Sequence, residues 1–203
     1  EPTPEVTPTP EVTPTPTPSE KEDVTVIFDD VKAGKWYVNA VQYVYDNDLM
    51  SGNEGFFKPT ENITRAQLVT TLYRLAGSPE VTDRSALDDF TDVKDQKYYT
   101  DALCWAYAAG IATGSNGAFN PTGLLTRQQM AAFFYRYADH QGMDISVKGN
   151  IDDMVNAEQV SSYAKDAIEW AVGTGLISGS EVVINGNKVK DLNPKGYTTR
   201  AQV

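Results

Sequence analysis

The residues best suited to chemistry are three arginines, each preceded by a threonine and followed two positions later by a glutamine. They are Arg65, Arg127 and Arg200. A threonine with a glutamine three residues later is a capping box, which places each arginine at the first position of a helix. The helix dipole disfavours a cation there by roughly 0.3–1 kcal/mol. A guanidinium beside free helix N–H groups can, however, bind an anion through a bidentate fork.

A recurring carboxylate forms the second set of candidates. Its members are Asp30, Asp92 and Asp153. Each could form a salt bridge with one of the arginines, and we weigh this structural pairing equally with the binding of an anionic ligand. The two roles can coexist.

Aromatic side chains recur as well, and we include them among the candidate ligand-binding residues. They are Trp36, Tyr98 and Tyr163. An aromatic ring can stack on the face of a sugar or pack between structural units. Packing is the simpler interpretation of any single ring, but three rings that recur with three arginines favour a carbohydrate ligand.

These candidates recur because the chain contains one unit three times. A shift of 62 residues aligns the second unit with the first without a gap, from Phe28 on Phe90 to Arg65 on Arg127. The third unit aligns with the second after two insertions. The larger insertion predicts a small hairpin over 182–189, with β-formers on either side of Asn-Gly. We expect a linker over 1–23 and units over 24–86, 87–147 and 148–203.

Each unit is predicted to hold two helices joined by a loop, so the fold class is mainly α. The first helix begins near Trp36 and places Tyr37, Ala40, Val41 and Val44 on one face. The second helix begins at the capping box. The third copy reaches Val203 one turn into its second helix, which predicts an uncovered apolar surface on its neighbours.

Three glycines are expected to end the first helices, and we also include them among the candidate ligand-binding residues. They are Gly52, Gly114 and Gly179.

Composition excludes several classes of function. The net charge of −11 argues against nucleic acid as a partner, because phosphate binding needs a basic face. One cysteine and one histidine exclude multi-thiolate and multi-histidine metal sites, and we expect no metal, cofactor or catalytic residue. The chain lacks an apolar run near the ~20 residues that a membrane-spanning helix needs.

Residues 1–18 are rich in alternating Thr-Pro and hold seven of the eleven prolines. Such a segment favours an extended polyproline conformation and is typical of spacers between extracellular modules. We interpret the chain as the C-terminal piece of a longer modular protein. An inert disordered tail is the alternative.

The repeated pattern resembles the S-layer homology (SLH) domain family over about residues 28–203. The resemblance rests on Phe28-x-Asp30-Val31, Trp36-x₃-Ala40-Val41, Gly52, Phe57-x-Pro59 and 63–67, each with its counterparts. All three motifs end in glutamine where the family more often has glutamate, and the third copy has Ile151 and Met154 in place of Phe and Val.

This resemblance implies three units about a pseudo-threefold axis, with the second helices in a central bundle. It also implies an extracellular location at the bacterial cell wall or S-layer of Gram-positive-type bacteria. The expected partner is a peptidoglycan-associated secondary cell-wall polysaccharide, which is anionic and often bears a pyruvate ketal. The arginines and aspartates named above would line the grooves between units that bind this sugar.

Two other classes of function remain open. Stacked helical units could form a protein–protein interaction module, which predicts an exposed apolar patch rather than arginine-lined grooves. The pairs Asp29-Asp30, Asp88-Asp89 and Asp152-Asp153 could serve a carbohydrate-active enzyme, but they recur in units of about 60 residues, and we do not expect an enzyme.

Overall fold

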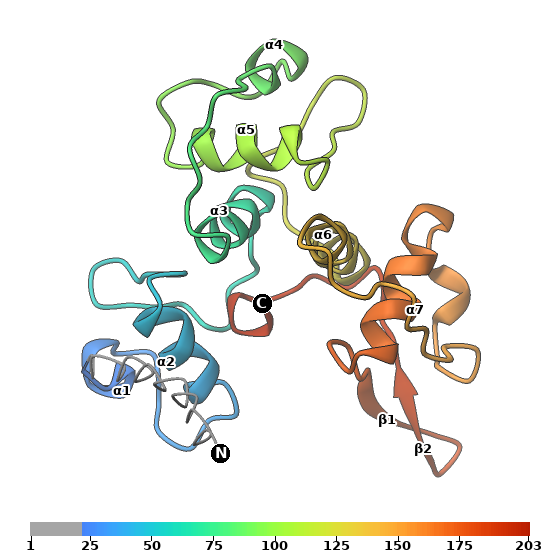
Figure 1. Cartoon of the computed structure of the whole chain (residues 1–203). Helices are drawn as coiled ribbons and strands as arrows, with labels where there is room; N and C mark the ends of the chain where they lie inside the picture. Colours follow the sequence, from blue (N-terminus) through green and yellow to red (C-terminus); the bar gives the residue numbers. More distant parts are fainter. Residues whose placement is uncertain (1–21) are drawn as a thin grey trace, which may run out of the picture.

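The computed structural model describes residues 22–203, so nearly all of the predicted linker lies outside the described residues. Three arms surround a common centre, with α3 and α6 innermost (Figure 1). The first unit contains α1 (Val24–Ile27), α2 (Val38–Asp46) and α3 (Arg65–Leu75). The second contains α4 (Ala86–Asp89), α5 (Thr100–Ala108) and α6 (Arg127–His140). The mainly helical fold class is therefore confirmed.

The third unit departs from the other two. It contains the short helices η1 (Ala157–Gln159) and η2 (Ser162–Ala164), then α7 (Lys165–Gly173), β1 (Ser180–Ile184), β2 (Asn187–Asp191) and η3 (Arg200–Gln202). The antiparallel pair β1–β2 confirms the predicted hairpin and extends beyond it at both ends. Asn185 and Gly186 form its turn with φ angles of 52° and 81°, the left-handed conformation that a two-residue hairpin turn requires.

A closed ring of three backbone hydrogen bonds joins the units at their centre. Ile63 N donates to Thr198 O (2.9 Å), Thr198 N donates to Leu125 O (2.9 Å), and Leu125 N donates to Ile63 O (3.0 Å). These three residues precede the three capping boxes, and each is 0% exposed. The ring therefore relates the units by the pseudo-threefold axis that the resemblance implies.

Each second helix begins on the loop of the next unit. Arg65 N and Ala66 N, at the start of α3, donate to Gly123 O (3.0 Å) and Pro121 O (2.9 Å) of the second unit. The same pair of bonds links α6 to the third unit and η3 to the first unit. All three capping boxes are formed. The first N–H groups of each helix are thus already bonded, so they are not free to bind an anion.

The apolar side of α2 is less covered than that of its counterparts. α3 packs on α5, and α6 packs on α7. Ala102 of α5 and Ala167 of α7 are accordingly buried, whereas Ala40 of α2 is exposed. A groove of about 320 Å³ borders this side, and its apolar lining includes Ala40, Val44, Leu75, Phe134 and Val203. The uncovered surface predicted from the short second helix of the third unit is present.

The prediction that three glycines end the first helices is wrong. The helices end six residues earlier, at Asp46, Ala108 and Gly173. In α5 the chain turns at Gly110, whose φ of +71° is the left-handed conformation usual after a helix. Gly114 has another role, because a Cβ at this position would lie 2.3 Å from the Phe90 ring and 2.6 Å from Ala118 O. Gly52 has the equivalent contacts with Phe28 and Phe56.

Gly114→Ala should therefore destabilise the fold by about 3 kcal/mol, because the added methyl group meets a ring and a backbone oxygen that cannot both move away. Gly110→Ala is the control, and we expect a loss of about 1 kcal/mol from backbone strain alone. Urea unfolding of the two variants measures the difference. Equal losses would show that the close packing against Phe90 is unimportant.

A buried hydroxyl at the axis yields a second prediction. Thr198 is 0% exposed and its Oγ1 has no hydrogen-bond partner in the described structure. Thr198→Val should raise the free energy of unfolding by about 1 kcal/mol, because it removes an unsatisfied polar group. The control is Thr70→Val, which removes a hydroxyl that donates to Ala66 O (2.8 Å) and should not stabilise. A lower melting temperature for Thr198→Val would contradict this view of the axis.

Candidate functional site

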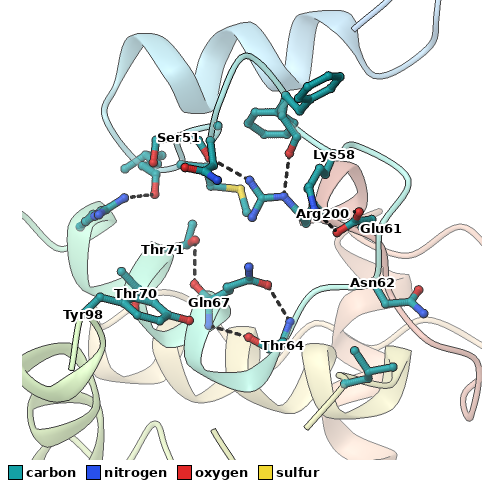
Figure 2. Close-up of a pocket in the computed structure, with 18 residues that line it drawn as sticks. Ser51, Lys58, Glu61, Asn62, Thr64, Gln67, Thr70, Thr71, Tyr98 and Arg200 are labelled. Atoms are coloured by element: carbon teal, nitrogen blue, oxygen red, sulfur yellow. Dashed lines mark hydrogen bonds and ion pairs between the residues drawn. The ribbon is translucent and has the colours of Figure 1, made fainter. Parts of the chain in front are cut away.

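Two large grooves lie between the units. Groove 1 has a volume of about 810 Å³, and its polar and aromatic lining includes Ser51, Thr71, Arg74, Tyr98 and Arg200 (Figure 2). Groove 2 has a volume of about 740 Å³, and the corresponding residues are Thr113, Phe133, Arg136, Tyr163 and Arg65. The two sets occupy equivalent positions in the aligned units.

Each groove takes its walls from all three units. In groove 2, Arg65 comes from the first unit, Phe133 and Arg136 come from α6 of the second, and Tyr163 comes from the third. In groove 1 each part comes from the preceding unit: the arginine, Arg200, comes from the third unit, the helix, α3, comes from the first, and the tyrosine, Tyr98, comes from the second. The grooves therefore exist only while the three units are closed around the axis.

The capping-box arginines bind backbone carbonyls of the next unit. Arg65 Nε donates to Phe119 O (2.7 Å) and its Nη2 donates to Thr113 O (2.8 Å). The guanidinium carbon lies 4.5 Å from the centre of the Phe119 ring and 5.2 Å from that of Phe133. The arginine is thus held at a fixed place on the wall of groove 2.

Arg200 repeats this arrangement in groove 1. Its Nε donates to Phe57 O (2.9 Å) and its Nη2 donates to Ser51 O (3.0 Å), as Figure 2 shows. Arg127 makes only the first of the two bonds, from Nε to Leu192 O (3.1 Å), and it lines neither groove. The hairpin inserted in the third unit occupies the chain segment that would otherwise form the equivalent loop.

Neither expectation for the arginines describes these contacts fully. Within residues 22–203, none of the salt bridges joins a capping-box arginine to Asp30, Asp92 or Asp153. The helix N–H groups that would complete an anion site are bonded to the neighbouring loop. The partners of Arg65 and Arg200 are neutral carbonyls, so their positive charge is not neutralised by direct pairing with a carboxylate.

Burial lowers the pKa of these guanidinium groups. Desolvation is the main cause for Arg65, Arg136 and Arg200, and the nearby Arg136 lowers the pKa of Arg65 further. An arginine guanidinium nevertheless stays protonated in proteins at neutral pH. Two partly desolvated cations that face one groove would be stabilised by an anion between them.

Two of the candidate aspartates, Asp30 and Asp92, hold the loops through backbone N–H groups. Asp92 accepts hydrogen bonds from Phe119 N (2.8 Å) and Asn120 N (2.7 Å), one on each carboxylate oxygen. Asp30 binds Phe57 N (2.8 Å) and Lys58 N (2.7 Å) in the same way. Asp92 also lines groove 2.

Asp153 does not take this role in the third unit. Leu192 N, which corresponds to Phe119 N, donates to Val155 O (3.0 Å), and Asn193 N donates to Asp191 Oδ1 (2.9 Å). Asp153 itself is exposed. The inserted hairpin supplies Asp191 at the end of β2. The Asp191 carboxylate accepts the Asn193 N–H group, which takes the place of the bond expected to Asp153.

The aromatic candidates are exposed. Tyr98 is 67% exposed on groove 1, and Tyr163 is 55% exposed on groove 2. Trp36 is 71% exposed and lines neither groove. Packing between units therefore does not account for these rings, and two of the three are placed where a sugar could stack.

Two of the three glycine candidates also line a groove. Gly52 lines groove 1 and Gly114 lines groove 2, whereas Gly179 lines neither. Gly179 has a φ of +70°, and a Cβ there would lie 2.6 Å from the end of the Met154 side chain.

Sequence reasoning missed a second arginine in each groove. Arg74 Nη1 donates to Leu49 O (3.2 Å) in groove 1, and Arg136 Nη1 donates to Thr113 Oγ1 (3.2 Å) in groove 2. The same 62-residue shift that aligns the capping boxes also aligns these two arginines. An arginine that recurs at the same position of two otherwise apolar helices could have identified both residues as candidates.

The two arginines of groove 2 should differ in their effect on stability. Arg65→Ala should lower the free energy of unfolding by about 2 kcal/mol, because two short charge-assisted hydrogen bonds between units are lost. Arg136→Ala removes only longer hydrogen bonds and should cost less than about 1 kcal/mol. Urea unfolding compares the two variants. An equal or larger loss for Arg136→Ala would contradict this assignment of roles.

Residues 22–203 contain no cluster of three or more histidine, cysteine, aspartate or glutamate side chains that could hold a metal ion. Every helix in the same range falls short of the length and apolar character needed to cross a membrane.

Comparison with known proteins finds the same domain in the first and the second unit. Residues 27–69 and 89–131 each match the S-layer homology domain. An endoglucanase of Bacillus sp. (strain KSM-635) is 31% identical over 178 residues, which are 86% of this chain and 18% of that protein. The S-layer protein sap of Bacillus anthracis is 25% identical over 154 residues, which are 75% of this chain and 18% of that protein.

A surface-layer 125 kDa protein of Lysinibacillus sphaericus is 30% identical over 166 residues, 79% of this chain and 13% of that protein. The chain thus spans less than a fifth of each of these three relatives. The domain match and the S-layer relatives indicate a location at the cell surface, attached to the cell wall. The S-layer homology domain family is thus supported at residues 27–69 of the first unit and 89–131 of the second.

Proposed function

We propose that this chain anchors a larger protein to the bacterial cell wall by binding an anionic secondary cell-wall polysaccharide in grooves 1 and 2, without catalysis. The observation that carries the proposal is the set of side chains that line each groove. Two arginines and an exposed tyrosine, drawn from three different units, face the same space.

The charge in the grooves favours an anionic ligand. Arg65 and Arg136 of groove 2 have neutral hydrogen-bond acceptors, and the carboxylate oxygens of nearby Asp92 already accept backbone N–H groups. A carboxylate on the ligand, such as that of a pyruvate ketal, would therefore meet guanidinium groups that lack a direct carboxylate partner.

Recognition must be local, because the protein as a whole is acidic. Residues 1–23 hold six carboxylates and one lysine, which leaves −6 of the total charge of −11 for the three units. Long-range attraction of a polyanion is thus unfavourable, although charges are screened beyond about 8–10 Å at physiological salt. Two grooves on one chain would offset this repulsion, because a long polymer can occupy both at once.

The size and surface of the grooves suit a short run of sugars. Their volumes of about 740 and 810 Å³ lie within the range of roughly 300–1,000 Å³ that is usual for small-ligand sites. Tyr98 and Tyr163 offer exposed rings against which a sugar face could stack.

The third unit is proposed to be of the same family as the first two. It contributes Thr198 to the central hydrogen-bonded ring, Arg200 to groove 1 and Tyr163 to groove 2. Its capping box at η3 is formed like those of α3 and α6.

The absence of catalysis is part of the proposal. Two members of the aspartate pairs considered for an enzyme already have partners: Asp30 uses both carboxylate oxygens to accept backbone N–H groups, and Asp89 accepts the hydroxyl of Tyr107 (2.7 Å). Protein–protein interaction through the stacked helical units is the alternative function.

A pull-down on purified cell-wall sacculi tests the proposal. The chain should be retained on intact sacculi and lost after acid removes the non-peptidoglycan polymer. Retention after this treatment would identify peptidoglycan itself as the target. No retention on either preparation would favour the protein-interaction function.

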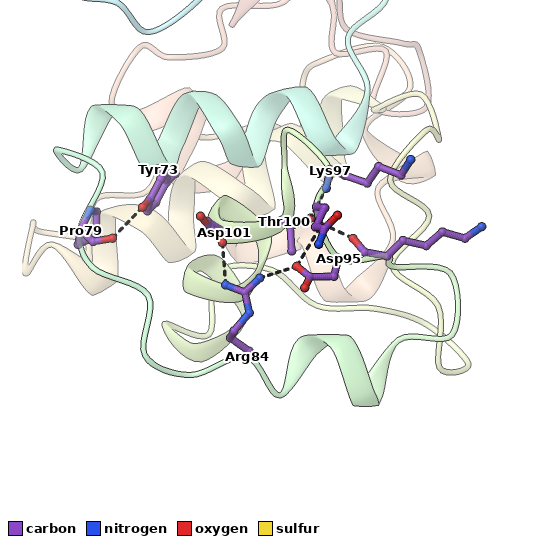
Figure 3. Close-up of polar contacts among 9 residues, drawn as sticks. Tyr73, Pro79, Arg84, Asp95, Lys97, Thr100 and Asp101 are labelled. Carbon is purple, nitrogen blue, oxygen red and sulfur yellow. Dashed lines mark hydrogen bonds and ion pairs between the residues drawn. The ribbon is translucent and has the colours of Figure 1, made fainter.

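Substitution of one arginine in each groove should weaken retention on intact sacculi. We expect Arg74→Ala with Arg136→Ala to weaken binding to intact sacculi more than tenfold, because each groove loses one of its two cations. The matched control is Arg84→Ala, which removes a cation that pairs with Asp95 (2.7 Å) and Asp101 (2.8 Å) outside both grooves (Figure 3). Equal weakening by the control would show that only overall charge matters.

A further inference from the structure

The two grooves differ at the residue that follows the capping-box arginine. This residue is Ala66 in the first unit and Ala201 in the third, but Gln128 in the second. Gln128 is only 4% exposed, although its side chain is polar. A buried amide requires hydrogen-bond partners, and all of those observed for this side chain belong to the third unit.

The Gln128 amide bonds the segment that carries the groove 2 tyrosine. Its Nε2 donates to Ser161 Oγ (3.2 Å) and to Tyr163 Oη (3.2 Å). Its Oε1 accepts from Ser161 N (3.0 Å). Lys195 Nζ also donates to Ser161 Oγ (2.6 Å), which ties the same segment to the loop after β2.

The phenol of Tyr163 is therefore held at its oxygen while much of the side chain stays exposed to the groove. Burial raises the pKa of this phenol, and the hydrogen bond from Gln128 opposes the rise. In groove 1 the corresponding Ala66 has no polar side-chain atom, so it cannot bond Tyr98 in this way. Tyr98 is also more exposed, at 67% against 55% for Tyr163.

The capping-box arginine of groove 2 also contacts one more aromatic ring than its counterpart in groove 1. The Arg65 guanidinium contacts the rings of both Phe119 and Phe133. The Arg200 guanidinium of groove 1 lies over Phe57, at 4.8 Å, and the position of Phe133 is taken there by Thr71. Thr71 uses its hydroxyl to bond Gln67 O (3.0 Å) within α3.

We propose that Gln128 is a positioning residue that fixes Tyr163, and that groove 2 is for this reason the tighter of the two sites for an anionic saccharide. The inference rests on the proposed function. Its physical basis is preorganisation: a ring held in place before binding loses less freedom when a sugar stacks on it. If one side chain is already immobilised before binding, the Kd of groove 2 should be lower than that of groove 1 by about three- to tenfold.

The probe for this inference is a methyl hexopyranoside that carries a 4,6-linked pyruvate ketal. The matched control ligand is the same glycoside with an ethylidene acetal, which lacks the carboxylate. Calorimetric titration of the full chain with Arg74→Ala reports mainly on groove 2, and titration of the chain with Arg136→Ala reports mainly on groove 1. We expect the Kd of groove 2 to be about three- to tenfold lower.

A double-mutant cycle separates positioning from general stability. In the Arg74→Ala background, Gln128→Ala and Tyr163→Phe should each raise the Kd by about three- to tenfold, because each removes one side of the same hydrogen bond. Gln128→Ala should then add little to Tyr163→Phe. Additive effects, or a Gln128→Ala variant that melts earlier yet binds equally well, would overturn the positioning role.

The remaining outcomes are also decisive. If Gln128→Ala does not fold, Tyr163→Phe still tests the hydrogen bond with Gln128 in place, and an unchanged Kd overturns the inference. Equal Kd values for the two grooves overturn the inference but leave the proposed function intact. Failure of the ketal to bind either groove more tightly than the neutral acetal contradicts both.

Discussion

The ring of three backbone hydrogen bonds about the pseudo-threefold axis is the constraint on which the rest of the structure depends. It joins residues 63, 125 and 198, which precede the three capping boxes and come from three units. Because the ring is closed, the start of each second helix is placed against the loop of the next unit. That contact satisfies helix N–H groups that would otherwise need water or a ligand. The axis therefore sets both the fold and the place of every groove.

The same contact explains why an arginine is tolerated at an electrostatically unfavourable position. The side chain of Arg65 extends away from its own helix and binds two carbonyls of the next unit. Those bonds offset the dipole penalty and join neighbouring units, while the charge itself remains without a direct carboxylate partner. The capping-box arginine is thus a structural tie and a groove cation at once. The arginines on the helix sides, Arg74 and Arg136, have the weaker structural ties.

The sequence predicted features that are local or repeated. The capping boxes, the β1–β2 hairpin and the helical class follow from residue type and spacing. The partners of Arg65 and the role of Gly114 could not be predicted, because both involve backbone oxygens, which every residue carries. Asp153 was aligned by sequence with Asp92, but the inserted hairpin brought Asp191 closer to the same loop. Gln128 was visible as a departure from alanine, but its contacts with Ser161 and Tyr163 span two units.

The central claim is that an anionic sugar lies between the units, beside the arginines. A crystal structure of the chain with the pyruvylated glycoside tests it most directly. The account predicts the ligand carboxylate within hydrogen-bond distance of Arg65 or Arg136 in groove 2, or of Arg74 or Arg200 in groove 1, with the sugar ring against the tyrosine of that groove. A ligand bound elsewhere, for example in the apolar groove beside α2, or one whose carboxylate points to solvent, would contradict the account.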